Sequence, residues 1–318
     1  MRNISLTILT LMLSLFCHGQ TPFEKKTYVY KTVEKTAIRA DLYRNTATKE
    51  ARPVIVWIHG GALIGGNRLG LPEDQRKFYM DEGYNVVSID YRLAPETKIP
   101  AILEDVKDAI TWVRKNGAML GIDPSKLYVV GHSAGGYLAL ATGYILKDPP
   151  KGIVSFYGYG DIRGDWYAKP DSFYVATRAH VTEQTAMSRI ADTVVTMSVS
   201  GDNRGDIYMY CRQNGKWPLL VGGKDPVKDE KWFYQYCPAR NVSAKYPPTI
   251  LLHGDKDSDV PFQQSVEMDR ELTAKNVKHK FIPVRNGEHG FDRATGVSTN
   301  PGTQEVFAEV ASFLATCR

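Results

Sequence analysis

Short apolar runs recur along the chain at fairly regular intervals, with polar or helix-compatible stretches between them. Most are rich in Val, Ile and Leu without alternating polar residues, which is typical of strands buried on both faces of a parallel sheet. We expect such strands at residues 54–59, 85–90, 127–131, 152–158, 249–254 and 280–284. Residues 27–44 alternate more clearly, which predicts two antiparallel strands ahead of them.

Helical periodicity fills intervals between these strands. Apolar residues recur at helical spacing within 101–117, and a last helix is expected to begin at Asn300–Pro301 and to bury Val306, Val310 and Phe313. Strands that alternate with helices predict an α/β fold, with a mostly parallel central sheet of about eight strands flanked by helices on both faces.

Residues 160–245 interrupt this alternation, because they are long for a connection and carry Trp166, Trp217 and Trp232. The segment leaves the carboxyl end of a strand, where open α/β sheets bind their ligands. We therefore interpret it as a cap insertion over a binding cleft, rather than as a cover for a sheet edge.

The first residues combine an early cation with an apolar run at 8–16 and then small or polar residues. This pattern predicts a signal peptide over residues 1–19, cleaved near Gly19 and Gln20, and therefore a secreted or periplasmic protein of residues 20–318. The run is shorter than the ~20 residues of a membrane span. The bulky Phe16 before Cys17 argues against a lipoprotein.

The composition is that of a globular protein with a large core: 318 residues, 43% hydrophobic and 24% charged. The net charge of +5 is mild, and the densest basic cluster, at 275–280, is interpreted as a solvated helix end that leads into a strand. Since no basic stripe with interleaved aromatic residues is present in the sequence, nucleic-acid binding is not expected.

Three cysteines follow the predicted cleavage point, and their spacing does not resemble a metal site. We expect neither a metal nor a cofactor. In an oxidising compartment Cys211 and Cys237 could form a disulfide, which would leave Cys317 free.

One hydroxyl, that of Ser133, lies where a strand is expected to turn into a helix. Residues 131–135 read G-x-S-x-G; they follow the apolar run 127–131, and a helix-like run begins after Gly136. Tiny neighbours let strand and helix nearly touch, so that a strained corner exposes the serine to a helix N-terminus. This pattern is typical of a nucleophile, which needs a base to take its proton.

The base and the acid are expected later in the chain, in the order acid and then histidine. His289 lies in a Gly-flanked loop after the strand 280–284, whereas His279 is interpreted as a surface residue and His253 as a support for the loop after its own strand. That loop offers Asp255, Asp257 and Asp259. We choose Asp257 as the acid that orients His289.

A calcium loop is the rival interpretation of the alternating acids at 255–261. It fails because Val260 stands at the sixth position, where glycine is required, and Val266 at the twelfth, where glutamate is required.

Five segments together resemble a known family: HGGALIGG (59–66), DYRLAPE (90–96), GHSAGG, HGDKDSDVP and EHGF. In this order they resemble the α/β-hydrolases, and within them the hormone-sensitive-lipase-like esterases and the secreted carbohydrate-esterase relatives of the BD-FAE type. The resemblance covers residues 59–291 but not the cap-like insertion at 160–245.

The resemblance implies roles for particular residues. Ser133 would be the nucleophile, Asp257 the acid and His289 the base. The backbone N–H groups of Gly61, Ala62 and Ala134 would form the oxyanion hole, with alanine at position 62 where a third glycine is usual. The YRLAPE segment would brace the loop near the site.

The leading hypothesis is a secreted serine carboxylesterase whose substrate is a small-molecule or carbohydrate ester, such as an acetyl or feruloyl ester. A prolyl-oligopeptidase-like peptidase is the alternative, although only about 40 residues precede the first core strand, too few for the propeller of those enzymes. A non-enzymatic binding protein on the same fold is the third hypothesis, and the complete set of Ser133, Asp257 and His289 argues against it.

Overall fold

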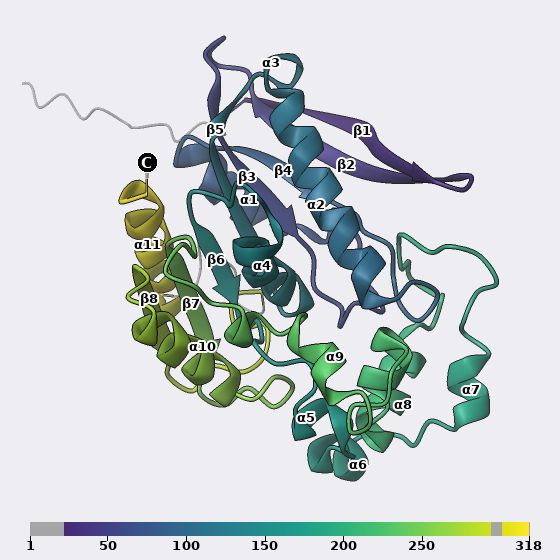
Figure 1. Ribbon diagram of the computed structural model, residues 1–318. Coiled ribbons are helices and arrows are strands. Elements are labelled where there is room, and N and C mark those ends of the chain that lie inside the picture. Colours follow the sequence, from purple (N-terminus) through teal and green to yellow (C-terminus); the bar gives the residue numbers. More distant parts are fainter. Residues whose placement is uncertain (1–21, 294–300, 318) are drawn as a thin grey trace, which may run out of the picture.

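A single eight-stranded sheet runs through the protein, whose computed structural model describes residues 22–293 and 301–317 (Figure 1). The strand order is β1-β2-β4-β3-β5-β6-β7-β8. The bounds are β1 Phe23–Val33, β2 Thr36–Asn45, β3 Arg52–Ile58, β4 Asn85–Ile89, β5 Ile122–His132, β6 Ile153–Phe156, β7 Thr249–Gly254 and β8 His279–Val284. Strands β1 and β2 are antiparallel to each other, and β2 to β4, whereas all later neighbours are parallel. The predicted mostly parallel sheet is confirmed.

The apolar runs form the central strands because both of their faces are buried. Every residue of β4, β6 and β7 is buried. Strand β5 is longer than the predicted 127–131, because its polar first half, from Ile122, also pairs with β3. Alternate side chains of the sheet thus enter two separate apolar layers.

Helices cover both faces of the sheet (Figure 1). Helices α2 (Ile99–Lys115), α4 (Ala134–Ile145) and α10 (Gln263–Ala274) contribute to one apolar cluster, with the short α3 (Gly117–Leu120) beside them. Helices α1 (Glu73–Asp81) and α11 (Pro301–Ala315) contribute to the other.

Two of these helices bear directly on sequence predictions. Helix α2 begins two residues earlier than the predicted 101–117 segment, and α11 begins at Pro301 and buries Val306, Val310 and Phe313 as expected. Asn300, the predicted cap, lies outside the described residues, as do the predicted signal peptide and its cleavage point.

The segment between β6 and β7 contains short helices that gather beyond the carboxyl ends of the strands, at the lower right of Figure 1. They are α5 (Asp165–Ala168), α6 (Ser172–Thr177), α7 (Glu183–Met187), α8 (Gly205–Asn214), η2 (Pro218–Gly222), α9 (Glu230–Tyr234) and η3 (Pro238–Arg240). Trp217 fastens them to the main domain: it is fully buried, stacks on Tyr167 with ring centroids 4.2 Å apart, and donates a hydrogen bond to the Ala62 carbonyl.

Cys211 and Cys237 are free thiols, so the disulfide that could have joined them is not formed in the structure. Both are fully buried, and burial raises the pKa of the Cys211 thiol to about 12. Cys237 instead donates to the Phe233 carbonyl at 3.3 Å. The third thiol, Cys317, is also free.

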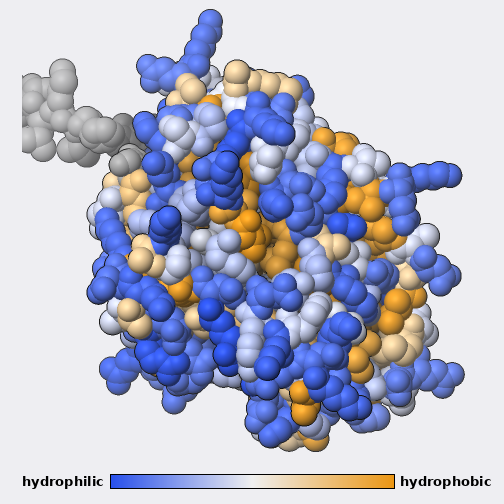
Figure 2. Space-filling model, in the orientation of Figure 1, coloured by the Kyte–Doolittle hydropathy of each residue, from blue (hydrophilic) through white to orange (hydrophobic). Residues whose placement is uncertain are grey.

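The face drawn in Figure 2 is mostly hydrophilic, with apolar side chains set between charged ones. Within residues 22–293 and 301–317, no helix combines the length and the apolar character needed to cross a membrane.

Candidate active site

Ser133 occupies the sharp corner between β5 and α4, with φ 56° and ψ −120°. A Cβ on Gly131 would lie 2.0 Å from the Gly135 carbonyl oxygen, and one on Gly135 would lie 2.1 Å from the Ile58 carbonyl oxygen. Side chains at either position would push strand and helix apart, which is the steric reason for the glycines. The helix begins at Ala134, not after Gly136, so part of the small-residue run belongs to its first turn.

The structure brings the three predicted side chains into one hydrogen-bonded chain. His289 Nε2 lies 3.1 Å from Ser133 Oγ, and His289 Nδ1 lies 2.8 Å from Asp257 Oδ2. They come from three loops at the carboxyl ends of β5, β7 and β8. This geometry suits a base between a nucleophile and an orienting acid.

The side chain of Asp257 is fully buried and is held from several directions. Its Oδ1 accepts the backbone N–H groups of Asp259 and Val260, at 2.9 and 2.8 Å. His253 supports the loop as expected: its Nε2 lies 3.0 Å from the Val260 carbonyl and 3.2 Å from Asp257 Oδ2. Among the described residues there is no group of acids, histidines and cysteines that could hold a metal.

The two ionisable partners shift each other's pKa values. Burial alone would raise the pKa of Asp257, but hydrogen bonds from His253 and His289 outweigh it and lower the pKa well below its usual range. Burial alone would lower the pKa of His289, but the hydrogen bond to Asp257 and the charges of Asp259 and Asp257 raise it above 6.5.

The two acids not chosen as triad members differ in position. Asp255 is exposed and accepts the backbone N–H of Asn286 at 2.7 Å, so it ties its loop to the next one. Asp259 lies inside the site, with Oδ2 at 3.5 Å from His289 Nε2. It faces the opposite imidazole nitrogen from Asp257.

The glycine-rich loop after β3 forms the wall beside Ser133. Gly61, Ala62 and Leu63 have φ values of 106°, 56° and 63°, so three successive residues are left-handed. A side chain at Gly61 would meet the Gly65 carbonyl oxygen at 2.3 Å. The turn is closed by Ile64 and Gly65, whose N–H groups donate to the Gly61 carbonyl. Oxyanion stabilisation by the N–H groups of Gly61, Ala62 and Ala134 stays a prediction.

The segment 90–96 braces this loop, as the resemblance implied. Tyr91 stacks on His59 with centroids 4.2 Å apart and donates to the His59 carbonyl. Burial lowers the pKa of His59 to about 4, so the ring is neutral at neutral pH. Glu96 pairs with Arg204 of the insertion at 2.7 Å, and Arg204 also donates to the Ile64 carbonyl.

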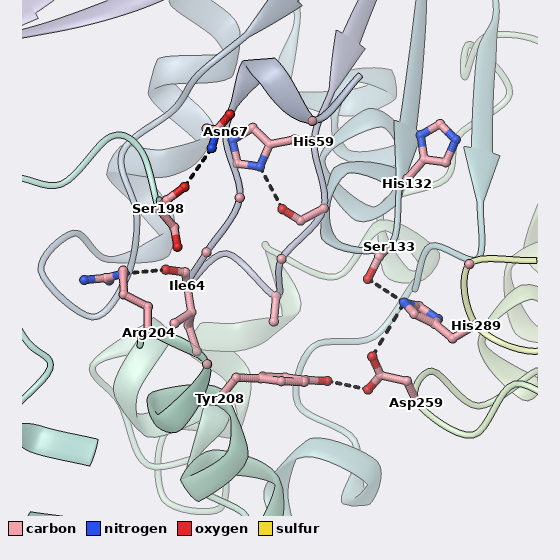
Figure 3. Close-up of a pocket in the computed structure, with 18 of the residues that line it drawn as sticks. His59, Ile64, Asn67, His132, Ser133, Ser198, Arg204, Tyr208, Asp259 and His289 are labelled. Atoms are coloured by element: carbon pink, nitrogen blue, oxygen red, sulfur yellow. Dashed lines mark hydrogen bonds and ion pairs between the residues drawn. The ribbon is translucent and has the colours of Figure 1, made fainter. Parts of the chain in front are cut away.

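A cavity of about 490 Å³ opens in front of Ser133. Four of its lining residues, Ser198, Arg204, Gly205 and Tyr208, belong to the insertion. Figure 3 shows Tyr208 lying across one side of the cavity and reaching Asp259. The segment predicted as a cap thus forms part of the wall around the serine.

Sequence reasoning missed a buried network behind the nucleophile. The ring of His132 points away from Ser133 (Figure 3). Its Nε2 lies 2.9 Å from Asp292 Oδ2. Tyr157 donates to Asp292 Oδ1 at 2.6 Å, and its ring lies against His289 with centroids 4.6 Å apart. Burial lowers the pKa of His132. The one signal for this network in the sequence was an acid, Asp292, three residues after His289.

Known proteins resemble this chain over most of its length. The curated relatives include a non-reducing polyketide synthase of Acremonium egyptiacum, which is 29% identical over 93% of this chain but only 16% of its own length. The chain therefore spans less than a fifth of that relative.

Solved structures share the fold. A Staphylococcus aureus protein of unknown function has a TM-score of 0.75 at 24% identity, covering 92% of this chain and 99% of its own. An α/β-hydrolase superfamily protein from Enterococcus faecalis has 0.71 at 24%, with the same coverage. A truncated carbohydrate esterase from gut microbiota has 0.65 at 21%, covering 94% of this chain and 98% of its own.

The family model of BD-FAE matches residues 40–272, which is more than half of the chain. With the parallel sheet, the serine corner and the structural neighbours above, this match identifies the family: the chain belongs to the BD-FAE family and has the α/β-hydrolase fold.

Proposed function

We propose that the protein is a serine carboxylesterase that hydrolyses acyl esters through an acyl-enzyme on Ser133. The observation that carries this proposal is the unbroken contact from Asp257 through His289 to Ser133 at the base of an open cavity. In this arrangement Ser133 can act as the nucleophile, His289 as the base and Asp257 as the acid that orients His289.

In the first half-reaction, His289 Nε2 takes the Ser133 proton as Oγ attacks the ester carbonyl carbon. The carbonyl oxygen becomes an oxyanion facing the N–H groups of Gly61, Ala62 and Ala134. The intermediate collapses, the bond to the alcohol oxygen breaks, and His289 gives its proton to the departing alcohol. Asp257 stabilises the imidazolium throughout.

In the second half-reaction, water replaces the alcohol. His289 takes a proton from the water, whose oxygen attacks the acyl carbon. The bond to Ser133 Oγ breaks, the serine regains its proton, and the acid product leaves.

We propose carbohydrate esters, with acetyl or feruloyl acyl groups, as the substrate class. Support comes from membership of the BD-FAE family and from the gut carbohydrate esterase among the structural neighbours. We also propose a secreted or periplasmic location from residues 1–19, which would bring the protein into contact with carbohydrate esters outside the cytoplasm.

Replacing Ser133 by alanine tests the mechanism. Ser133→Ala should abolish p-nitrophenyl acetate turnover and labelling by a fluorophosphonate probe, while circular dichroism is unchanged. Ser258→Ala, a serine outside the cavity lining, is the matched control and should keep both. Wild-type turnover in Ser133→Ala would contradict the proposal.

Substrate class is tested separately, with acetylated xylan, a feruloyl ester, a long-chain ester and a proline-ending chromogenic amide. The proposal expects turnover of the first two and none of the amide. Turnover of the amide alone would instead favour a peptidase.

A further inference from the structure

Asp259 is an acid within the cavity that the triad does not use. Its side chain is about one-fifth exposed, and its Oδ2 lies 3.5 Å from His289 Nε2, the nitrogen that faces Ser133 (Figure 3). The orienting role belongs to Asp257, on the other nitrogen. A carboxylate beside Nε2 therefore needs a different explanation.

The insertion holds this carboxylate in place. Tyr208 donates its hydroxyl to Oδ1, and Arg212 Nη1 lies 3.5 Å from the same oxygen. The Arg212 side chain is fully buried and also pairs with Asp171. Aromatic rings surround its guanidinium, at 4.8 Å for Tyr174 and 5.2 Å for Tyr167.

The charge of Asp259 also acts on phenols of the insertion. Burial, followed by the negative charge of Asp259, raises the pKa of Tyr167, Tyr174 and Tyr208. A carboxylate supported by a buried arginine and by phenolic hydroxyls is a built feature of the cavity wall rather than a loose surface acid.

The proton transfer fixes which part of a substrate lies near this carboxylate. His289 Nε2 must protonate the departing alcohol oxygen, so that oxygen must come within hydrogen-bond reach, ~3 Å, of Nε2. Asp259 Oδ2 lies on the same side of the ring. The alcohol part of the ester, not the acyl part, is thus the part that Asp259 would contact.

An ionised carboxylate can only accept hydrogen bonds, so it favours an alcohol that carries a donor. We infer that Asp259 is a specificity residue which binds a hydroxyl group on the carbon adjacent to the one that bears the ester oxygen, so that the enzyme prefers monoesters of vicinal diols, including sugars. This inference rests on the proposed ester hydrolysis and narrows it to one arrangement of the alcohol.

Three acetates of nearly equal size test this inference: ethylene glycol monoacetate, its methyl ether, and propyl acetate. The wild-type enzyme should hydrolyse the glycol ester with a kcat/KM about tenfold or more above that of the other two, because only it offers a donor. In Asp259→Asn this preference should shrink by about tenfold. Asp255→Asn, a charge change in the same loop outside the cavity lining, should leave the preference unchanged.

Tyr208→Phe gives an independent measurement, should Asp259→Asn fail to fold. It removes the hydroxyl that holds Oδ1 and should lower kcat/KM for the glycol ester by a larger factor than kcat/KM for propyl acetate, so that the preference for the glycol ester shrinks. Equal kcat/KM for the glycol ester and its methyl ether in the wild-type enzyme would overturn the inference. So would an unchanged preference in a folded Asp259→Asn. Neither result touches the proposed function, which is tested separately by Ser133→Ala and would be contradicted if none of the three acetates were hydrolysed.

Discussion

The pKa of His289 is set by its burial and by the carboxylates around it. Burial lowers its pKa, but the hydrogen bond to Asp257 and the charges of Asp259, Asp257 and Asp292 raise it above the usual 6.5. Since only the neutral imidazole can take the serine proton, kcat/KM should rise with pH through a midpoint above 6.5. A pH–rate profile of p-nitrophenyl acetate hydrolysis measures this midpoint.

Asp259→Asn should shift that midpoint to lower pH, because one of the negative charges that raise the pKa of His289 is lost. The matched control is Asp269→Asn, which lies by His279 away from the site and should leave the profile in place. A midpoint that stays fixed, or moves upward, in Asp259→Asn would contradict this account of the His289 environment.

Asp257→Asn should be the most damaging change among the three acids of its loop. An amide cannot stabilise the imidazolium, so kcat should fall by about 10³–10⁴-fold with little change in KM. Asp255→Asn should lower kcat far less, because the Asp255 side chain contacts only the neighbouring loop, through the backbone N–H of Asn286. Steady-state kinetics of both variants make the comparison, and equal losses would show that Asp257 was wrongly chosen.

The contact between Ser133, His289 and Asp257 was predictable from sequence because each residue follows a recognisable strand, and parallel strands end at one edge of the sheet. Asp259 was one of three candidate acids, but the sequence did not predict its position beside His289 Nε2. Its partners Tyr208 and Arg212 lie on a short helix of the insertion, and no local pattern shows where that helix packs.

At the scale of elements, the strand–turn–helix corner should be intolerant of even one methyl group. Gly135→Ala would place a Cβ 2.1 Å from the Ile58 carbonyl oxygen, so β3 and α4 must separate. We expect a loss of at least ~2 kcal/mol in the free energy of unfolding. Gly205→Ala, at the start of α8 with open space around it, should change stability by about 1 kcal/mol at most.

Thermal or denaturant unfolding of the two alanine variants checks this contrast. Similar stability of both would show that the corner relaxes easily, and that the glycines at 131 and 135 serve another purpose.

Strands buried on both faces were the easiest to predict. A continuous apolar run is typical of a central strand, and β4, β6 and β7 are buried at every residue. The first half of β5 was missed because its residues 123–126 are polar and partly exposed. The start of α4 was placed too late, because glycines that normally weaken a helix are kept here for close packing.

At the scale of the whole molecule, Arg204 joins the insertion to the main domain. Its guanidinium pairs with Glu96 at 2.7 Å and donates to the Ala94 and Ile64 carbonyls, with both charged side chains about 4% exposed. Glu96→Ala would leave a buried charge unpaired, which should cost about 3 kcal/mol of stability. Because Ile64 belongs to the loop beside Ser133, kcat/KM should also fall.

Arg189→Ala is the control for this change, because it breaks an ion pair with Asp206 that is about one-third exposed at either side. The expected loss is about 0.5 kcal/mol or less. Denaturation curves and p-nitrophenyl acetate kinetics for both variants give the comparison. A Glu96→Ala variant as stable and active as Arg189→Ala would show that the Glu96–Arg204 pair contributes little to holding the insertion on the main domain.

The position of β8 has a consequence for how the protein would lose activity on heating. This strand pairs with β7 alone, and its residues are half-buried or exposed, whereas Ser133 stands at the centre of the sheet. An edge strand opens at a lower free-energy cost than central strands. Because His289 follows β8, turnover should be lost on heating at a lower temperature than the circular dichroism signal. Cooling from a temperature between these two transitions should restore turnover, since the core has not unfolded.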